Sequence, residues 1–361
     1  MCSTSTLLKE NRMKLKRAVL TGNIIALALI ALLVTMTGAE AKQQGKLKVG
    51  YTPGGASILA FVAQDQKLFA KEGVEVELVQ FSSTGDGLNA LNSGKIDIGI
   101  SFGTAAPLTF ISKGSDFTII GGALAGGHPV IALPARAGQF KTIKDFKGKT
   151  VAVPRLYTAD VVWRGALRRA GIDPNKDLKI IELKNPPAVL EAVKSGKVDV
   201  GIGASSIFLQ AKESGLAIVG WSNDFFPQHP CCRIVAKGKA VSGDPDVYRA
   251  FLRSLLQAEK IKDTNSKLAQ SITKRYMNID DNLAATFVSE PHQHVSVDPD
   301  KHRVKQMWHE LKDINYVTSE LDINRYINTQ LYRDALGELI RRNPKDRYYL
   351  NAKKHFEKQN N

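Results

Sequence analysis

The sequence predicts an α/β protein built from two similar lobes, because one supersecondary pattern occurs in it twice. Each copy is the end of a helix, a glycine stop and a short strand with β-branched residues at alternate positions, over residues 88–100 and 190–202. A loop of small, hydroxyl-rich residues follows each strand and opens another helix. Because open α/β sheets bind ligands beyond the carboxyl ends of their strands, we expect a ligand between these loops.

The composition is that of an ordinary globular protein that is long enough for two domains with sizeable cores. The chain has 361 residues, of which 43% are hydrophobic and 24% charged. Its formal net charge of +15 is spread along the chain, with a basic excess from Arg341 onward. Aromatic residues are not interleaved with the basic ones and no nucleic-acid motif occurs, so no nucleic-acid partner is expected.

The first 41 residues have the three parts of a secretory signal peptide. Met13–Arg17 is basic, Ile24–Met36 is an almost unbroken apolar run, and Ala39–Ala41 is a small-x-small cleavage site. The run is shorter than the roughly 20 residues that span a membrane. We therefore expect cleavage near Ala41 and a mature protein in the periplasm, with an uncleaved anchor as the alternative.

The chain after the leader alternates between strand and helix patterns, and then becomes mostly helical. In the first lobe, strands are expected at 46–51, 74–79, 96–100 and 117–121, and helices at 57–71, from the 82–86 cap to 94, and from 104 to 112. A strand at 130–133 is expected to end the first part of the first lobe. In the second lobe, strands are expected at 150–153, 178–183, 198–202 and 216–220, with helices ending near 170 and starting at 186. A return strand at 234–236 precedes helices at 247–262, 267–276, 283–289, 301–312 and 323–341.

This order predicts two lobes that the chain enters and leaves twice. Lobe 1 is expected to comprise residues 46–133 and 236–330, and lobe 2 residues 136–233. The crossings are expected at 133–135 and 234–236, where two short segments act as a hinge. Residues 331–361 are expected to form a basic C-terminal helix and tail.

Five segments, in their order and spacing, resemble the substrate-binding proteins of ABC importers, in the branch for nitrate, sulfonates, taurine and pyrimidine precursors. The segments are Leu47–Tyr51, Leu91–Asp97, Ile143–Ala152, Leu167–Gly171 and Glu191–Asp199. The resemblance implies an α/β, two-lobed periplasmic-binding-protein fold of type II, here with a helical C-terminal extension. It also implies a protein that closes on a small solute and delivers it to permease subunits in the membrane.

Five loops on the expected cleft side offer hydroxyls and backbone N–H groups at helix N-termini, which can hold an anion without a counter-charge. Helix capping alone explains any single loop, but five loops on one cleft favour a ligand site. The loops are Thr52–Gly55, Ser82–Gly85, Gly103–Ala105, Tyr157–Ala159 and Ala204–Ser206. Their candidate ligand contacts are Thr52, Gly54, Gly55, Ser82, Ser83, Gly103, Thr104, Ala105, Tyr157, Thr158, Ala159 and Ser205.

Three further candidate ligand contacts lie outside this list. Arg155 follows the 150–153 strand and can pair bidentately with a sulfonate or carboxylate, or can be a plain surface residue. His128 and His229 lie in loops, where a structural imidazole is the alternative to a ligand contact. A flat wall for the solute is expected from aromatic residues, which are Tyr51, Phe102, Tyr157, Trp221 and Phe225.

Cys231 and Cys232 are adjacent, so a disulfide between them needs a strained ring. No spaced Cys/His set, nucleophile–base pair or phosphate loop occurs, so we expect no metal, no cofactor and no enzymatic activity. The sequence therefore predicts a monomeric extracytoplasmic protein that captures a small anionic or heteroaromatic solute, such as a sulfonate, taurine, a nitrate-like anion or a pyrimidine precursor. The alternatives are an enzyme resembling the pyrimidine synthases and a sensor that presents its solute.

Overall fold

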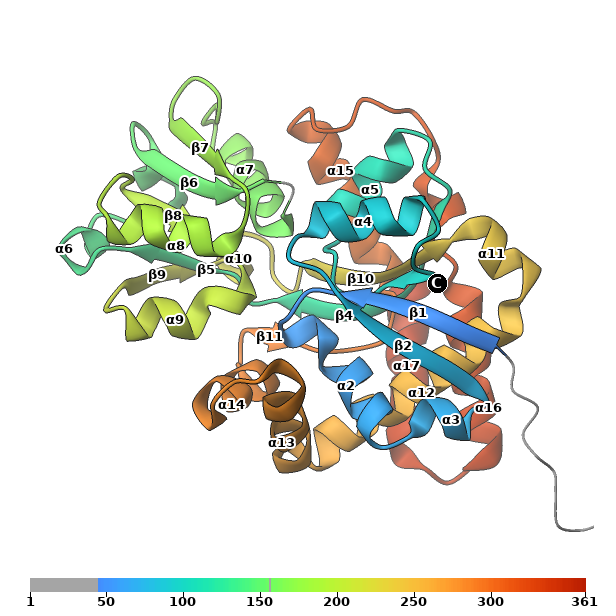
Figure 1. The fold of residues 1–361 in the computed structure, drawn as a ribbon. Helices are drawn as coiled ribbons and strands as arrows, with labels where there is room; N and C mark the ends of the chain where they lie inside the picture. The colour runs from blue at the N-terminus through green and yellow to red at the C-terminus, as the bar shows by residue number, and fades with distance from the viewer. Residues whose placement is uncertain (1–44, 156) are drawn as a thin grey trace, which may run out of the picture. The chain divides into compact units, whose positions relative to one another are not determined.

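Two separate β-sheets organise the residues that the structure describes, 45–155 and 157–361, in a computed structural model (Figure 1). The first sheet consists of β1 (Gly45–Tyr51), β2 (Val74–Gln80), β3 (Ile98–Gly99), β4 (Phe117–Gly126), β10 (Pro230–Lys237) and β11 (Gln293–His294), in the order β11-β4-β10-β3-β1-β2. The second sheet consists of β5 (Pro129–Ala132), β6 (Thr150–Pro154), β7 (Lys179–Leu183), β8 (Val200–Ile202) and β9 (Ala217–Trp221), in the order β7-β6-β8-β5-β9. The predicted signal peptide and its cleavage site lie outside the described residues.

Helices cover both faces of the first sheet. One face carries α2 (Ile58–Asp65), α3 (Leu68–Lys71), α12 (Pro245–Thr264), α13 (Ser266–Met277), α14 (Asp281–Ser289), α16 (Thr329–Arg342) and α17 (Arg347–Asn360). The other face carries α4 (Thr84–Asn92), α5 (Ala105–Ser112) and α15 (Lys301–Asp313). The short elements η1 (Gly55–Ser57), η4 (Ile323–Tyr326) and α11 (Gly238–Gly243) complete this part.

The strand period of two explains these two layers, because successive side chains point to opposite faces of a sheet. In β10, Ile234 and Ala236 join the apolar cluster around α2 and α12, whereas Val235 joins the cluster around α5 and α15. The first sheet therefore separates two buried cores.

The second sheet follows the same rule. In β6, Val151 and Val153 pack with α7 (Thr158–Arg169), and Ala152 packs with α8 (Pro186–Lys194). The remaining elements of this part are α6 (Pro134–Ala137), η2 (Ile143–Phe146), η3 (Ser205–Ile207), α9 (Phe208–Glu213) and α10 (Ser222–Phe225). Helix α7 also turns Val161 and Val162 toward the core around α5 and α15, so it packs against both sheets.

The chain passes between the sheets earlier than the sequence predicts. It crosses at Gly126–Pro129 and at Phe226–Pro230, so the crossings expected at 133–135 and 234–236 are wrong. Gly126 and Gly127 have φ angles of 68° and 82°, a conformation that glycine adopts without steric cost and that turns the chain here. An apolar run such as 130–133 predicts a strand but does not indicate which sheet the strand joins.

The C-terminal region also differs from the expected helix and tail. It consists of the two helices α16 and α17, whose Tyr332 and Phe356 rings are buried and stack with centroids 5.2 Å apart. The expected helix 57–71 is broken at Lys67, which has a φ of 55°. No helix in the described part of the chain has both the length and the apolar character needed to cross a membrane.

Candidate ligand-binding cavity

A cavity of about 310 Å³ opens between the carboxyl ends of strands from the two sheets. Each of the five predicted loops contributes to its wall, together with residues from α8, α9, β10, α13 and α14. The lining residues are Thr52, Pro53, Gly54, Gly55, Ala56, Ser82, Thr84, Ser101, Gly103, His128, Tyr157, Thr158, Asn185, Pro186, Pro187, Ala204, Ser205, Ser206, Ile207, Gln210, Cys231, Cys232, Met277, Ile279, Leu283 and Phe287.

A pair of hydroxyls forms the first-sheet side of the cavity. Thr52 follows β1, and its backbone N–H donates to Ser101 Oγ over 2.7 Å, while the two hydroxyl oxygens lie 3.1 Å apart. Sequence reasoning missed Ser101, although it directly follows the strand of the first repeat. Each hydroxyl also donates to the backbone carbonyl oxygen of the other residue, over 3.3 Å from Thr52 and 3.1 Å from Ser101. The two hydroxyls therefore hold each other in place and keep acceptor capacity for a ligand.

Thr158, at the start of α7, links the two sheets beside the cavity. Its hydroxyl donates to the carbonyl oxygen of Cys231 over 2.9 Å and accepts from the backbone N–H groups of Thr104 and Ala105, at 3.1 and 3.4 Å. The N–H groups that we expected Thr104 and Ala105 to offer a ligand are therefore engaged by the protein itself, and neither residue lines the cavity. The sequence cannot show this, because the acceptor lies more than 50 residues away.

Tyr157, which precedes α7, and Thr84, the first residue of α4, both line the cavity. Burial raises the pKa of the Tyr157 phenol, so the ring stays uncharged at neutral pH. On the second-sheet side, Asn185 uses its side-chain oxygen to accept from Ala188 N–H at the N-terminus of α8. Ser205 and Ser206 complete this side.

A group of apolar residues forms part of the cavity wall, and sequence reasoning did not find it. These residues are Met277 at the end of α13, Ile279 between the two helices, and Leu283 and Phe287 in α14. Of the aromatic residues expected to form a flat wall, only Tyr157 lines the cavity. Tyr51 and Phe102 are buried in the core, Trp221 stacks on His292 with centroids 3.9 Å apart, and Phe225 packs beside Phe146.

The two predicted histidines lie one behind the other. His128 lines the cavity, its Nε2 lies 2.9 Å from Cys231 Sγ, and burial lowers the pKa of His128 to about 4. His229 lies behind it, with ring centroids 5.1 Å apart, and its Nε2 lies 2.7 Å from Ser222 Oγ. Burial holds the pKa of His229 well below its usual range, so both rings are neutral at pH 7.

Three other candidates lie away from the cavity. The Arg155 side chain is 73% exposed and reaches Glu182 over 4.0 Å, which matches the surface alternative. Ser83 caps α4 by accepting from Asp86 N–H, and Ala159 is fully buried in the second-sheet core. Capping and core packing account for these two residue types without a ligand.

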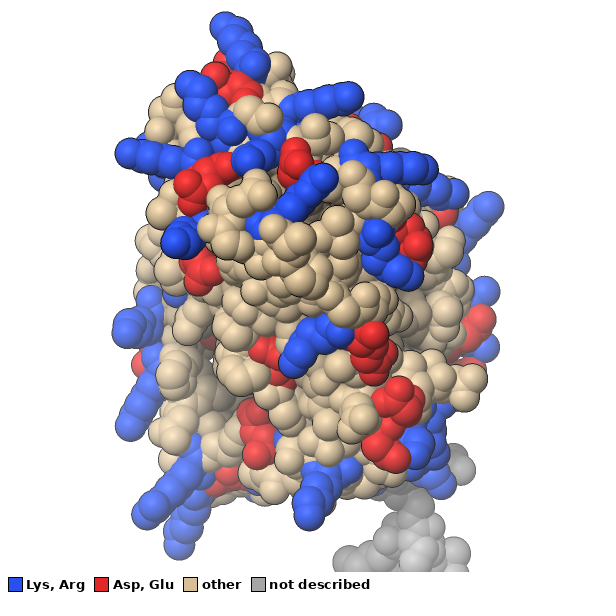
Figure 2. All heavy atoms as spheres, turned by 90° about the vertical axis from the view of Figure 1, so that its left-hand side faces the viewer, with Lys and Arg blue, Asp and Glu red and all other residues tan. Residues whose placement is uncertain are grey.

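Among the residues that the structure describes, no Asp, Glu, Lys or Arg side chain lines the cavity. Basic side chains are instead scattered over the surface with acidic ones between them, as Figure 2 shows for the side that carries the second sheet. Among the described residues, no group of three or more His, Cys, Asp or Glu is arranged to hold a metal ion. The cavity can therefore hold a small solute between hydroxyl groups and an apolar wall.

Two sheets with helices on both faces and a cavity between their strand ends define the periplasmic-binding-protein fold, with a helical C-terminal region. The profile of the NMT1-like family matches residues 40–276, and the chain belongs to this family.

Solved structures share this fold at low sequence identity. A zinc-bound ligand-binding component of an ABC-type import system from Staphylococcus aureus superposes with a TM-score of 0.68 and 18% identity, over 81% of this chain and 99% of that one. The aliphatic sulphonate-binding protein SsuA from Escherichia coli gives 0.66 and 20%, over 80% and 99%. The nitrate-binding protein NrtA from Synechocystis gives 0.68 and 16%, over 81% and 89%.

Among curated proteins, one from Brucella abortus that is named as a binding protein is 26% identical over 144 residues. The match covers 39% of this chain and spans 44% of the length of that relative.

Proposed function

We propose that this protein is an extracytoplasmic solute-binding protein, which captures a small solute in the periplasm and delivers it to the permease subunits of an ABC importer. The observation that carries this proposal is the uncharged cavity between the two sheets, lined by loops from both. Membership of the NMT1-like family and the fold shared with binding proteins of import systems support it. The predicted signal peptide agrees with the proposed compartment.

We propose further that the solute is a small, flat heteroaromatic molecule without a formal charge, such as a pyrimidine precursor. A wall without cations offers no counter-charge to a sulfonate or nitrate, while Leu283 and Phe287 offer apolar surface to one face of a ring. The hydroxyl oxygens of Thr52 and Ser101 can accept from amino groups at its edge, and the Ser205 hydroxyl can donate to a ring nitrogen. An anion held only by helix N-termini is the competing outcome.

A thermal-shift panel tests the ligand class. We expect aminopyrimidines to raise the melting temperature of the full chain, and alkanesulfonates, taurine and nitrate to leave it unchanged. Stabilisation by the anions alone would reject the heteroaromatic class, and no shift with any class would count against the binding function.

A matched pair of leucine variants tests the location of the site. Leu283→Ala removes part of the apolar wall and should weaken binding about tenfold, or about 1.4 kcal/mol. Leu350→Ala, at an exposed position away from the cavity, should leave the dissociation constant unchanged. Equal affinities for both variants in a titration would place the ligand elsewhere.

We also propose that the two sheets, each with its helices, act as two lobes that close on the solute. A ligand that touches loops from both lobes favours the closed arrangement only by its difference in affinity for the two states. A shift from 1:99 to 99:1 takes about 5.5 kcal/mol of that difference. Small-angle scattering should show a smaller radius of gyration with ligand, whereas an unchanged radius with confirmed binding would mean a preformed cavity.

A further inference from the structure

Cys231 and Cys232 face the same cavity although they are neighbours in one strand. Adjacent side chains of a regular strand point to opposite faces, but the pairing of β10 with β4 shifts register between Pro230 and Arg233. This bulge interrupts the alternation. Both cysteines consequently line the cavity, both are free thiols, and their Sγ atoms lie 3.2 Å apart.

The surroundings make the two thiols unequal. The hydrogen bond from the Cys231 thiol, followed by a backbone hydrogen bond from Gly103 and the charge of Arg233, lowers the pKa of Cys232. The hydrogen bond that Cys231 donates, together with burial, raises the pKa of Cys231 well above its usual value. The thiolate is the nucleophilic form of cysteine. Cys232 is therefore the nucleophile that attacks first, and Cys231 is the thiol that attacks second and resolves the mixed disulfide.

We propose that Cys231 and Cys232 form a reversible dithiol/disulfide modification site in the cavity wall, whose co-reactant is an external disulfide, either a small molecule or a protein. The Cys232 thiolate attacks one sulfur of the external disulfide, forms a mixed disulfide and expels the first thiolate, which takes up a proton. Cys231 then attacks the Cys232 sulfur and expels the second thiolate, which receives the proton of Cys231. One dithiol and one disulfide thus become one ring disulfide and two free thiols.

The ring should open easily under reducing conditions. Consecutive Cα atoms lie about 3.8 Å apart, below the range of roughly 4.4–6.8 Å that relaxed disulfides span. Strain of this kind makes a disulfide more reducible. The pair can therefore switch between the dithiol and the disulfide, and is not a permanent cross-link.

The oxidation state of Cys231 and Cys232 affects the hydrogen bond that links the two sheets. The Cys231 carbonyl oxygen accepts the hydrogen bond from Thr158, which also holds the start of α5. Closing the ring changes the backbone at that carbonyl, and replaces the Cys231 thiol, 2.9 Å from His128 Nε2, with a disulfide sulfur. The oxidised cavity offers two sulfur acceptors where the reduced one has thiol donors.

Mass spectrometry of the full chain with Cys2→Ser, which leaves only this pair, tests the proposal. After incubation with oxidised glutathione, we expect the intact mass to fall by two hydrogens and peptide mapping to show a Cys231–Cys232 link. Dithiothreitol should restore both thiols. Cys231→Ser and Cys232→Ser controls in the same background should form at most a glutathione adduct.

Circular dichroism of each variant verifies that the fold is kept, so that a negative result has one meaning. Two free thiols after prolonged oxidation, or a glutathione adduct that persists in the folded pair, would overturn the proposal. Formation of the ring only after denaturation would also overturn it, because the native geometry is its basis. None of these outcomes depends on the identity of the transported solute.

Discussion

The two copies of the repeated segment are tied to their sheets in the same way but end in different surroundings. In the first copy, Asp97 Oδ2 accepts from the backbone N–H of Lys48 over 2.7 Å. In the second, Asp199 Oδ2 accepts from the backbone N–H of Thr150 over 2.8 Å. Beyond the strands, the first loop leads to N–H groups that Thr158 occupies, whereas the second loop presents Ser205 to the cavity.

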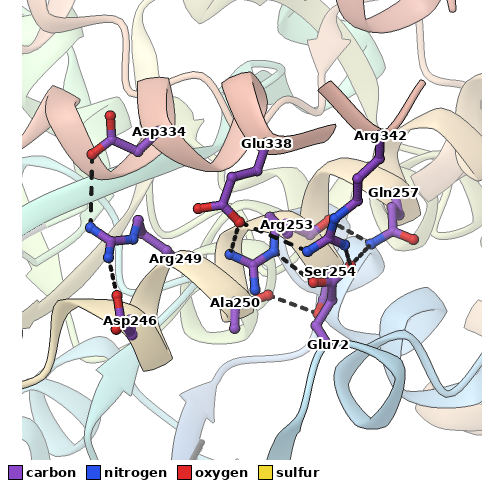
Figure 3. Close-up of polar contacts among 10 residues, drawn as sticks. All are labelled: Glu72, Asp246, Arg249, Ala250, Arg253, Ser254, Gln257, Asp334, Glu338 and Arg342. Carbon is purple, nitrogen blue, oxygen red and sulfur yellow. Dashed lines mark hydrogen bonds and ion pairs between the residues drawn. The ribbon is translucent and has the colours of Figure 1, made fainter. Parts of the chain in front are cut away.

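The ion pairs found in the two sheets differ more than the two copies of the repeat do. Behind the first sheet, α12 and α16 carry an ion-pair cluster centred on the buried Arg253 and Glu72, which bond over 2.6 Å (Figure 3). Arg253 also bonds Glu338 over 2.7 Å, and the half-exposed Arg342 reaches Glu72 over 2.7 Å. In the second sheet, Asp199 pairs with Arg136 over 2.5 Å, and both side chains are about one-third exposed. The first sheet is therefore backed by a polar clamp of Glu72, Arg253, Glu338 and Arg342, none of which belongs to the first copy of the repeat. In the second sheet, the partly solvated pair includes Asp199 of the second copy itself.

The largest expected effect is on the clamp of the first sheet. Arg253→Ala removes one of the two arginines that pair with the nearly buried Glu72 and also the partner of Glu338. Because Arg342 still pairs with Glu72, the free energy of unfolding should fall by about 3 kcal/mol, the lower end of the range for breaking a buried ion pair. Arg249→Ala, one turn earlier on α12 in a more exposed pair with Asp246, should cost less than about 1 kcal/mol. Urea unfolding measures both, and equal losses would remove the distinction between buried and solvated pairs.

The helical layer of the first sheet should also make stability depend on pH. Burial raises the pKa of Glu259 to about 7, although the carboxylate accepts from Val297 N–H. The folded state therefore holds a proton that the unfolded state releases near pH 4.5, so this stabilisation is complete below pH 4.5 and is lost as the pH rises through 7.

Glu259→Gln keeps the acceptor but cannot ionise. It should match the parent chain below pH 4.5 and exceed it by up to about 3 kcal/mol above pH 7. Parallel unfolding curves at pH 4.5 and 8 measure this difference, and a constant offset between the two proteins would contradict the assignment.

The aspartates of the repeat test the similarity of the two copies directly. Asp97→Ala and Asp199→Ala each remove a charge-assisted hydrogen bond to backbone, so each should cost about 1.5–3 kcal/mol. The loss at Asp199 should be larger by about 0.2–1 kcal/mol, because Arg136 loses its partner too. The Asn variants, which keep an acceptor, serve as controls; a negligible loss at either aspartate would break the comparison.

The smallest expected effect is at Arg155, next to the second sheet. Because its side chain is mostly exposed and lies away from the cavity, Arg155→Ala should change stability by no more than about 0.5 kcal/mol. Calorimetric titration with the solute found in the panel should give an unchanged affinity. A tenfold loss of affinity would instead support the ligand contact that the sequence suggested for Arg155.

Local features of the chain were predictable because short-range physics controls them. Gly94 and Gly196 end their helices with φ angles of 75° and 70°, as the helix–glycine–strand pattern predicts. The five loops at strand ends all reach the cavity, since parallel strands carry their carboxyl ends to one edge of a sheet. Alternating apolar residues likewise predicted the strands of both sheets except β11, whose two residues are Gln293 and His294.

Long-range packing decided the rest. The sequence by itself determined the class of fold, the repeat and the loops that a ligand can meet. Only the tertiary structure placed β5 in the second sheet, brought α14 over the cavity, and let Thr158 take the N–H groups at the start of α5. Only the bulge in β10 turned both Cys231 and Cys232 toward the same cavity. Each of these results depends on contacts between segments far apart in the chain, which local propensity and periodicity do not encode.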